Sequence, residues 1–193
     1  MTPAGARFSA CRRWRYLLWR CWDEAKPAAN FLMLNPSTAD EVQLDPSCTR
    51  ARNYAERWGY GAVIITNIFG WRATDPQEMK DAKDPVGRGN NRAILEAAKA
   101  AKLVVCAWGN HGEHLGRASA IVDLLARNRI RLHALRVNGG GHPAHPLYLP
   151  GTLAPQRFVY SRGMPASFTS LRQSSRSARL ISSSRSGVEP SAE

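Results

Sequence analysis

Four short apolar runs constrain the fold of this chain more than any other feature. They are bounded by polar residues and lie at residues 31–34, 62–66, 103–107 and 132–137. Between and after them, helical patterns are predicted over residues 46–58, 90–101 and 116–128. Short buried strands that alternate with helices form a mainly parallel sheet with helices on both faces. The sequence therefore predicts an α/β three-layer sandwich with a mainly parallel four-stranded central sheet and an N-terminal edge strand at residues 16–22.

Two local signals support these helices. Asp45 followed by Pro46 is typical of an N-cap with proline at the first helical position, and Gly59 marks the end of that helix. In the last helix Ile121, Leu124 and Leu125 share one face, as expected of a helix that packs on a core.

Length and composition predict one ordinary domain. The chain has 193 residues, of which 44% are hydrophobic, and no apolar run approaches the roughly 20 residues of a membrane span. We expect a flexible N-terminus at residues 1–12, a single α/β domain at 13–160 and a disordered Ser- and Arg-rich tail at 161–193. The N-terminus has no signal-peptide pattern, and the four cysteines form no C-x-x-C pair, so a cytoplasmic protein without a zinc ribbon is expected.

The charge of the chain predicts a polyanionic partner. The formal net charge is +12 and the isoelectric point is near 10.3. Five arginines and two glutamates after residue 160 give the tail +3, which leaves +9 on residues 1–160. Such a surplus attracts nucleic acid.

Every predicted parallel strand ends in a polar, loop-forming cluster. The carboxyl ends of parallel strands meet at one edge of the sheet, where ligands bind in open α/β folds. Amides, imidazoles and aromatic rings are therefore expected to converge there. The four clusters are Asn35-Pro36-Ser37; Asn67 with Phe69-Gly70-Trp71-Arg72; Trp108-Gly109-Asn110-His111-Gly112; and Asn138 followed by glycines and His142-Pro143-Ala144-His145-Pro146.

Several enzyme classes lack their sequence motifs. No Walker-type phosphate loop and no G-x-G-x-x-G follows a strand, and Ser37 and Ser47 lie in no nucleophile elbow. A nucleotide triphosphatase, a dehydrogenase and a serine hydrolase are therefore not expected.

The histidines leave an alternative open. His111 and His114 are three residues apart, as are His142 and His145, and two such pairs at neighbouring strand ends would suit a metal-dependent hydrolase. However, Pro143 prevents a regular helix through the second pair. We therefore expect no metal and no cofactor, and interpret the imidazoles as contacts to an anion or a base edge.

Phe69 has two interpretations. It follows an amide at a strand end and precedes Arg72, so its ring would suit stacking on a planar ligand. A core aromatic beneath a loop explains the position equally well.

An ordered string of motifs resembles a known family. LNPSTAD, DPSCTRARNYAERWGYG, TNIFGWRATDP, DPVG, WGNHG and HPLYLP, in that order, are similar to a bacterial and phage family of unknown function, domain of unknown function 1643. The resemblance covers about residues 15–150.

The strand-end motifs also resemble those of the uracil-DNA glycosylase superfamily. Asn35-Pro36 is similar to the Asn-Pro form of its first motif, and Asn67 to the asparagine that often ends its second strand. Trp108-Gly109 matches a late turn. Its His-Pro loop matches either His142-Pro143 or His145-Pro146; we favour His145 because Leu147 follows it.

This resemblance implies a uracil-DNA-glycosylase-like fold and a monofunctional DNA glycosylase. Asn35 would position a water, with Asp40 or Asp45 as the missing general base, and His145 would stabilise the departing base, whose negative charge an imidazole can meet. The expected base-binding residues are Pro36, Ser37, Asn67, Phe69, Asn110 and His111. The expected DNA-binding residues are Arg72, His142, Leu147 and Tyr148.

The residue after Asn-Pro bears on the substrate. Ser37 is small, and the superfamily's uracil-restricted members carry a tyrosine there, so room at C5 is implied. This room allows a thymine or a C5-modified cytosine, as phages use, and uracil is not privileged over them. This suggests phage defence by a monomer acting on DNA. Two alternatives remain: a non-catalytic nucleic-acid or nucleotide-binding module on the same fold, and the metal-dependent hydrolase.

Overall fold

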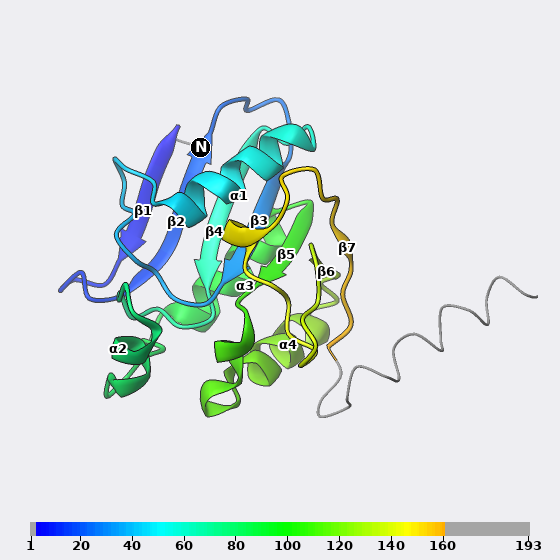
Figure 1. Cartoon of the computed structure of the whole chain (residues 1–193). Helices are drawn as coiled ribbons and strands as arrows, with labels where there is room; N and C mark the ends of the chain where they lie inside the picture. Colours follow the sequence, from blue (N-terminus) through cyan, green and yellow to red (C-terminus); the bar gives the residue numbers. More distant parts are fainter. Residues whose placement is uncertain (1–2, 161–193) are drawn as a thin grey trace, which may run out of the picture.

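The described part of the chain, residues 3–160, forms a single seven-stranded sheet (Figure 1). The structure is a computed structural model. Residues 1–2 and 161–193 lie outside the described part, and the Ser- and Arg-rich tail falls there. The strands are β1 (Ala4–Phe8), β2 (Arg15–Cys21), β3 (Ala28–Met33), β4 (Ala62–Asn67), β5 (Leu103–Ala107), β6 (Leu132–Ala134) and β7 (Gln156–Arg157).

The sheet is parallel at its centre and antiparallel at both sides. Its order is β1-β2-β4-β3-β5-β6-β7. β3 pairs in parallel with β4 and β5, and β5 with β6, whereas β1, β2 and β7 join antiparallel. The α/β class and the four parallel strands agree with the sequence prediction.

The prediction of four strands plus one edge strand is wrong in strand number. β1 forms within the segment expected to be a flexible N-terminus, and it covers β2, which is therefore not an edge strand. At the other side the two-residue β7 pairs with β6. Neither strand has a hydrophobic alternation that would mark it in the sequence. β1 is stabilised by antiparallel pairing with the next strand, β2, and β7 by pairing with β6.

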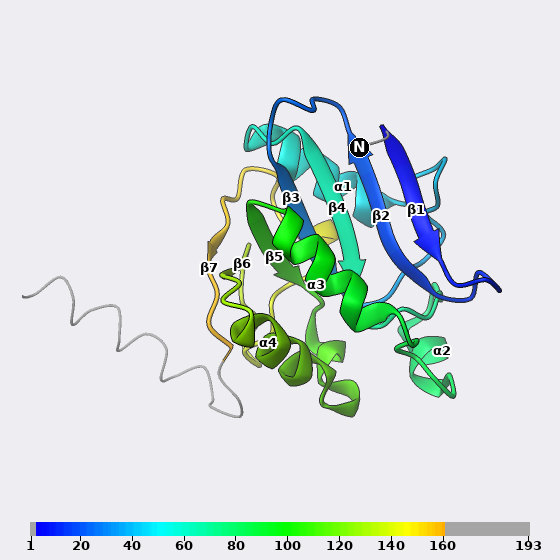
Figure 2. The same ribbon diagram turned by 180° about the vertical axis from the view of Figure 1, so that it is seen from behind.

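Helices cover both faces of the sheet. The α-helices are α1 (Pro46–Arg57), α2 (Pro76–Asp81), α3 (Asn90–Ala100) and α4 (Arg117–Arg127), and the 3-10 helices are η1 (Asn110–Gly116) and η2 (Pro146–Tyr148). α1 lies on one face (Figure 1) and α3 and α4 on the other (Figure 2). α1 begins where predicted, since the Asp45 side chain accepts a 2.8 Å hydrogen bond from the Cys48 amide.

Alternate side chains of the central strands pack into two separate apolar cores, one on each face of the sheet. Phe31 packs on the α1 side, where its ring stacks on Trp58 at 5.8 Å between centroids. Leu32 packs on the other side with Ile94 of α3 and Ile121 of α4. The sheet therefore separates two apolar layers, and a strand-end side chain belongs to one layer or the other.

The side on which the chain adds its next strand changes between β3 and β5, which are themselves parallel neighbours. From β3 the chain passes through α1 to β4 on one side, and from β5 it passes through α4 to β6 on the other. Ligands of doubly wound folds bind at such a switch point, outside the carboxyl ends of the strands. In residues 3–160 no helix has the length and apolar character needed to cross a membrane.

Candidate active site

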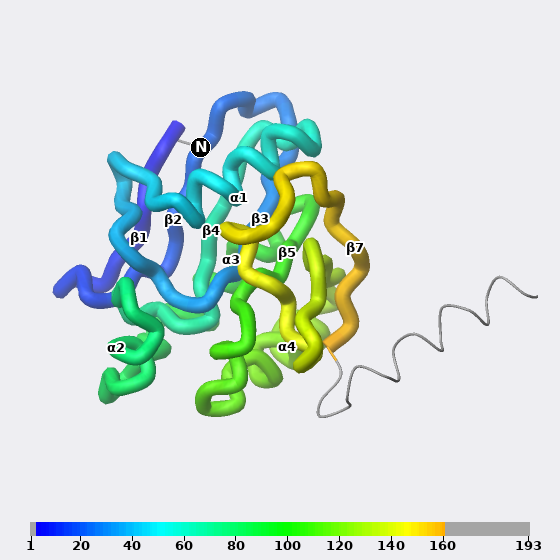
Figure 3. Tube along the Cα trace, viewed as in Figure 1, coloured from blue at the N-terminus to red at the C-terminus, as the bar shows by residue number. Residues whose placement is uncertain are grey.

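The loops that follow the parallel strands lie together at one edge of the sheet, the lower edge in Figure 3. The loop after β4 pairs with the loop after β3, because the Phe69 amide donates to the Leu34 carbonyl at 2.9 Å. The loop after β5 pairs with the loop after β6, because the Gly109 amide donates to the Pro143 carbonyl at 2.8 Å. All four polar clusters therefore reach this strand-end edge.

Asn35 joins two of these loops. Its Nδ2 donates to the carbonyls of Pro36 at 3.1 Å and Ala73 at 2.7 Å. Ser37 adds a contact, its hydroxyl lying 3.2 Å from that of Thr74. Both N–H groups of the Asn35 amide are thereby used, so Oδ1 is the only atom of this side chain that can orient a water.

Asn67 is held by a buried arginine. Arg15 is 1% exposed, and its guanidinium donates to Asn67 Oδ1 at 3.2 Å and to the Ala39 carbonyl at 2.8 Å. A guanidinium only donates hydrogen bonds, so the atom of Asn67 that faces it must be the oxygen. The Asn67 NH₂ group therefore points the other way, as a donor.

The surroundings of Arg15 explain how a cation is kept there. Burial lowers the pKa of Arg15, while the nearby Asp45 and Cys48 act in the opposite direction. Burial also raises the pKa of the Cys48 thiol to about 12, so this thiol is neutral at pH 7. Asp45 is thus the negative charge that balances Arg15.

His145 is partly buried and neutral at pH 7. Burial lowers its pKa, and the charge of Asp45 opposes that shift. Its Nδ1 accepts a 3.4 Å hydrogen bond from the Leu147 amide at the start of η2. A neutral imidazole with Nδ1 as acceptor carries its proton on Nε2, which makes His145 a hydrogen-bond donor.

The two candidate carboxylates differ in their environment. Asp40 accepts 2.8 Å hydrogen bonds from the amides of Val42 and Gln43, and these bonds lower its pKa. Such a turn makes Asp40 a weak base. Asp45 caps α1 and is the carboxylate whose charge acts on His145.

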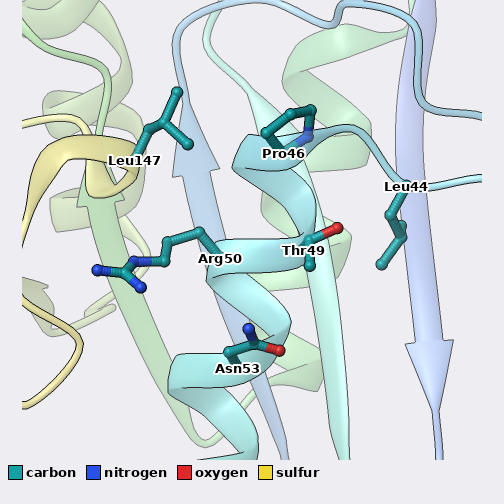
Figure 4. A pocket seen from close by; sticks show the side chains of 6 residues that line it. All are labelled: Leu44, Pro46, Thr49, Arg50, Asn53 and Leu147. Atoms are coloured by element: carbon teal, nitrogen blue, oxygen red, sulfur yellow. The ribbon is translucent and has the colours of Figure 1, made fainter.

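A hollow of about 430 Å³ lies between the first turns of α1 and Leu147 of η2, and neither Asp45 nor His145 lines it. Figure 4 shows Leu147 of η2 across from the first turns of α1. Tyr148, the next residue, is 85% exposed. An Arg50 side chain that bonds to the Leu149 carbonyl holds η2 against α1. The hollow is lined by Leu44, Pro46, Thr49, Arg50, Asn53 and Leu147.

Phe69 lies on the opposite side of the sheet. It is fully buried in the core of α3 and α4, and its ring packs against His114 with 5.7 Å between centroids. Because no ring face is exposed, this structure favours the core interpretation of Phe69. Strand alternation does not extend past Asn67, so sequence alone did not place this ring.

The β5 loop and the β6 loop are fastened to each other. Asn110 Oδ1 accepts from Asn138 at 3.0 Å, and the buried His142 pairs with Glu113 at 2.8 Å between Nε2 and Oε1. His111 is exposed on η1. Of the two His-Pro candidates, His142 is thus engaged by a carboxylate.

The paired histidines do not converge. His142 meets Glu113, His114 packs on Phe69, and His145 accepts from the Leu147 amide. Across residues 3–160, no three His, Cys, Asp or Glu side chains gather as a metal-binding group would require.

Arg72 lies against the β1–β2 turn, where Arg12 is paired with Glu41 at 2.9 Å. The Arg72 amide donates to the Arg13 carbonyl at 2.9 Å, and its guanidinium lies 5.1 Å from the centroid of the Phe8 ring. The Arg12 guanidinium lies 4.0 Å from the same centroid. Sequence analysis identified Arg72 but missed Arg12, because strand pairing alone brings them together.

The strand-end edge as a whole is nearly neutral. Segments 9–14, 34–45, 68–75, 108–116 and 135–148 hold four arginines and five carboxylates. The surplus of positive charge on residues 1–160 therefore lies on other parts of the surface.

Comparison with known proteins identifies the family of this chain. The model of the family described as "Protein of unknown function (DUF1643)" matches residues 15–147. The chain belongs to the DUF1643 family. No curated protein and no solved structure matches the sequence at a significant level.

The DUF1643 match begins at Arg15 and ends at Leu147. It leaves out β1 and β7, and it contains Asn35, Asp45, Asn67 and His145. Arg15 is a second site residue, after Arg12, that sequence reasoning missed. Its signal was an arginine directly before a strand, which in a sequence this basic does not stand out.

Proposed function

We propose that this DUF1643 protein hydrolyses the N-glycosidic bond of a base flipped out of DNA. The observation that carries the proposal is His145, a neutral imidazole whose Nε2–H remains available because Nδ1 accepts from Leu147. A donor of this kind stabilises the negative charge that develops on a departing base. The resemblance of the strand-end motifs to the uracil-DNA glycosylase superfamily, which implies a fold of that kind, supports the same reaction.

The residues divide the reaction between them. Water, oriented by Asn35 Oδ1, attacks the sugar carbon, and the electron pair of the breaking C–N bond leaves with the base. Asp45 accepts the proton of the water, and His145 hydrogen-bonds to an oxygen of the base. Asn67 offers its NH₂ group to the base edge, since Arg15 holds its oxygen. The reaction needs no cofactor.

The DNA contacts come from two places on the strand-end edge. Arg72 and Arg12 would hold phosphates, and Leu147 with the exposed Tyr148 would fill the space that the flipped base leaves. Ser37, partly exposed beside the Asn35-Pro36 turn, leaves room at C5 of a pyrimidine. We therefore propose a C5-modified cytosine as substrate, met by a cytoplasmic monomer during phage defence.

Oligonucleotides carrying uracil, mismatched thymine or a C5-modified cytosine test this function. Alkaline cleavage after incubation reveals abasic sites. We expect cleavage at the modified cytosine, loss of cleavage in His145→Ala, and retention in His133→Ala, whose histidine lies on β6 and belongs to none of the strand-end loops. No cleavage on any member of the panel would overturn the proposal.

A second candidate is a non-catalytic nucleic-acid-binding module. The buried Phe69 favours it, because no stacking platform for a base is open at this position. Binding to the whole panel without base release, equal in wild type and in His145→Ala, would establish this alternative.

A further inference from the structure

We propose that the edge of the sheet opposite the candidate active site binds the phosphate backbone of duplex DNA without regard to sequence. This basic edge consists of five exposed cations. It is independent of the proposed glycosylase, because it uses none of the residues of the strand-end edge. Its members are Lys99, Lys102, Arg127, Arg129 and Arg131.

Sheet register and helix direction bring these side chains together. Val104 of β5 pairs with Leu132 of β6, so Lys102 and Arg131 lie just before neighbouring strands. Lys99 and Arg127 belong to the last turns of α3 and α4, which cover the same face of the sheet (Figure 2). Lys102 and Arg131 therefore lie side by side, and the other three cations belong to the helix ends that lead into β5 and β6.

The basic edge carries a surplus of positive charge. The nearest carboxylates along the chain are Glu96, which pairs with Arg7 and Arg92, and Asp123, one turn before Arg127. Within the described residues, the ion pairs involve Arg7, Arg12, Lys26, Arg92 and His142, and none of the five. The strand-end edge is nearly neutral by comparison, so long-range attraction for a polyanion is strongest here.

Arg129 is a cation at a position where the backbone conformation favours glycine. At the end of α4 the Ile130 amide donates to the Leu125 carbonyl at 3.0 Å and the Arg129 amide to the Ala126 carbonyl at 2.9 Å, the Schellman pattern. Arg129 takes the left-handed position of this motif, with φ of 59°. Glycine is strongly preferred there because it has no Cβ.

The end of α1 provides an internal comparison. There the Tyr60 amide donates to Ala55 and the Gly59 amide to Glu56, both at 3.0 Å, and glycine occupies the left-handed position with φ of 82°. The same motif thus carries glycine at one helix and arginine at the other. Helix-dipole stabilisation accounts for cations in a last turn, but not for an arginine at a position that favours glycine.

The distribution of apolar side chains favours DNA over a membrane. Binding to a lipid surface combines cations with exposed apolar side chains. Among residues 3–160, four of the five exposed large hydrophobic residues, Val42, Leu115, Val137 and Tyr148, lie on the strand-end loops instead. The fifth, Val159, follows Phe158, whose amide donates to Leu132 at the start of β6, so the basic edge has one exposed apolar side chain nearby.

The test measures binding of the full chain to an unmodified DNA duplex across a range of salt concentrations. The probe carries no target base, so its result does not depend on glycosylase activity. The test variant is Lys102→Gln/Arg129→Gly/Arg131→Gln. The control, Arg52→Gln/Lys83→Gln/Arg88→Gln, removes equal charge from exposed positions elsewhere.

We expect the plot of log binding constant against log salt concentration to become less steep by roughly 2–3 in the test variant, since each neutralised phosphate contributes about 0.9 to the slope. In the control the slope should change by less than about 1. Arg129→Gly alone should keep or raise Tm, which shows that lost binding is not lost folding. An unchanged slope in the test variant would overturn the proposal. So would an equal fall in the control, or binding to phosphatidylserine vesicles in place of DNA.

Discussion

Arg15 donates a hydrogen bond to Asn67 Oδ1 across 3.2 Å, between β2 and the end of β4. This bond, inside the sheet layer that faces α1, fixes which atom of Asn67 can meet a ligand. It also joins an antiparallel flanking strand to the parallel centre of the sheet.

Replacement of Arg15 should destabilise the fold. Arg15→Ala leaves the Ala39 carbonyl and Asn67 Oδ1 without their buried donor, and we expect a loss of about 2–4 kcal/mol in the free energy of unfolding. Urea denaturation measures it. Arg13→Ala, at an exposed position nearby, should cost less than about 0.5 kcal/mol. Equal losses in the two variants would contradict the assigned role.

Asn35 should not tolerate an aspartate. Its NH₂ group donates to two carbonyls, and a carboxylate would place an acceptor against both. We expect Asn35→Asp to be less stable than Asn35→Ala by about 1 kcal/mol, because a charge facing unpaired acceptors is costly to bury. Thermal unfolding of the two variants compares them. A more stable Asn35→Asp would show that the loops do not depend on this amide.

The lowered pKa of His145 predicts that the protein loses stability in acid. Its pKa is below 6.5 in the folded state because of burial, so below pH 6.5 the unfolded chain binds the proton more readily. The free energy of unfolding should therefore decrease as pH falls from 7 to 5. The decrease should be smaller in His145→Asn, and urea titrations at several pH values measure the difference. Parallel curves for the two proteins would remove His145 as the cause.

Asp45 combines two roles that substitutions can separate. Asparagine caps helices as well as aspartate does, so Asp45→Asn should keep the cap of α1 and lose only the charge that balances Arg15, whereas Asp45→Ala should lose about 1 kcal/mol more. If Asp45 is the general base, both variants should lose base release by roughly 10²–10⁴-fold. Rapid-quench assays on the cleaved oligonucleotide measure this rate. Full activity of Asp45→Asn would leave Asp45 with the capping role alone.

Gly112 should be intolerant of any side chain. A Cβ there would lie 2.2 Å from Cδ1 of the buried Trp108, whereas a Cβ at Gly139 would meet nothing within 4 Å. We expect Gly112→Ala to cost about 2–3 kcal/mol by overpacking and Gly139→Ala less than about 0.5 kcal/mol. Chemical denaturation of the matched pair tests this packing. Equal stability would mean that η1 moves freely over Trp108.

Local signals were enough for the parallel centre of the fold. The run at 31–34 and the Asp45-Pro46 start of α1 depend on residues close together in sequence, and both were predicted. The short α2 was missed although Asp75-Pro76 repeats the same capping signal and Asp75 accepts from the Gln77 amide at 2.8 Å. β1 and β7 were missed because their partners, not their own residues, stabilise them.

The sequence by itself determined an α/β sheet, the edge at which polar strand endings gather and the overall positive charge. Hydrophobic periodicity and turn residues act over a few positions, so these features can be inferred without a structure. Only the tertiary structure decided that Arg15 lies buried against Asn67, that Phe69 faces the opposite core and that the positive surplus lies away from the strand-end loops. These depend on strand register and on which face each side chain takes, and long-range pairing sets both.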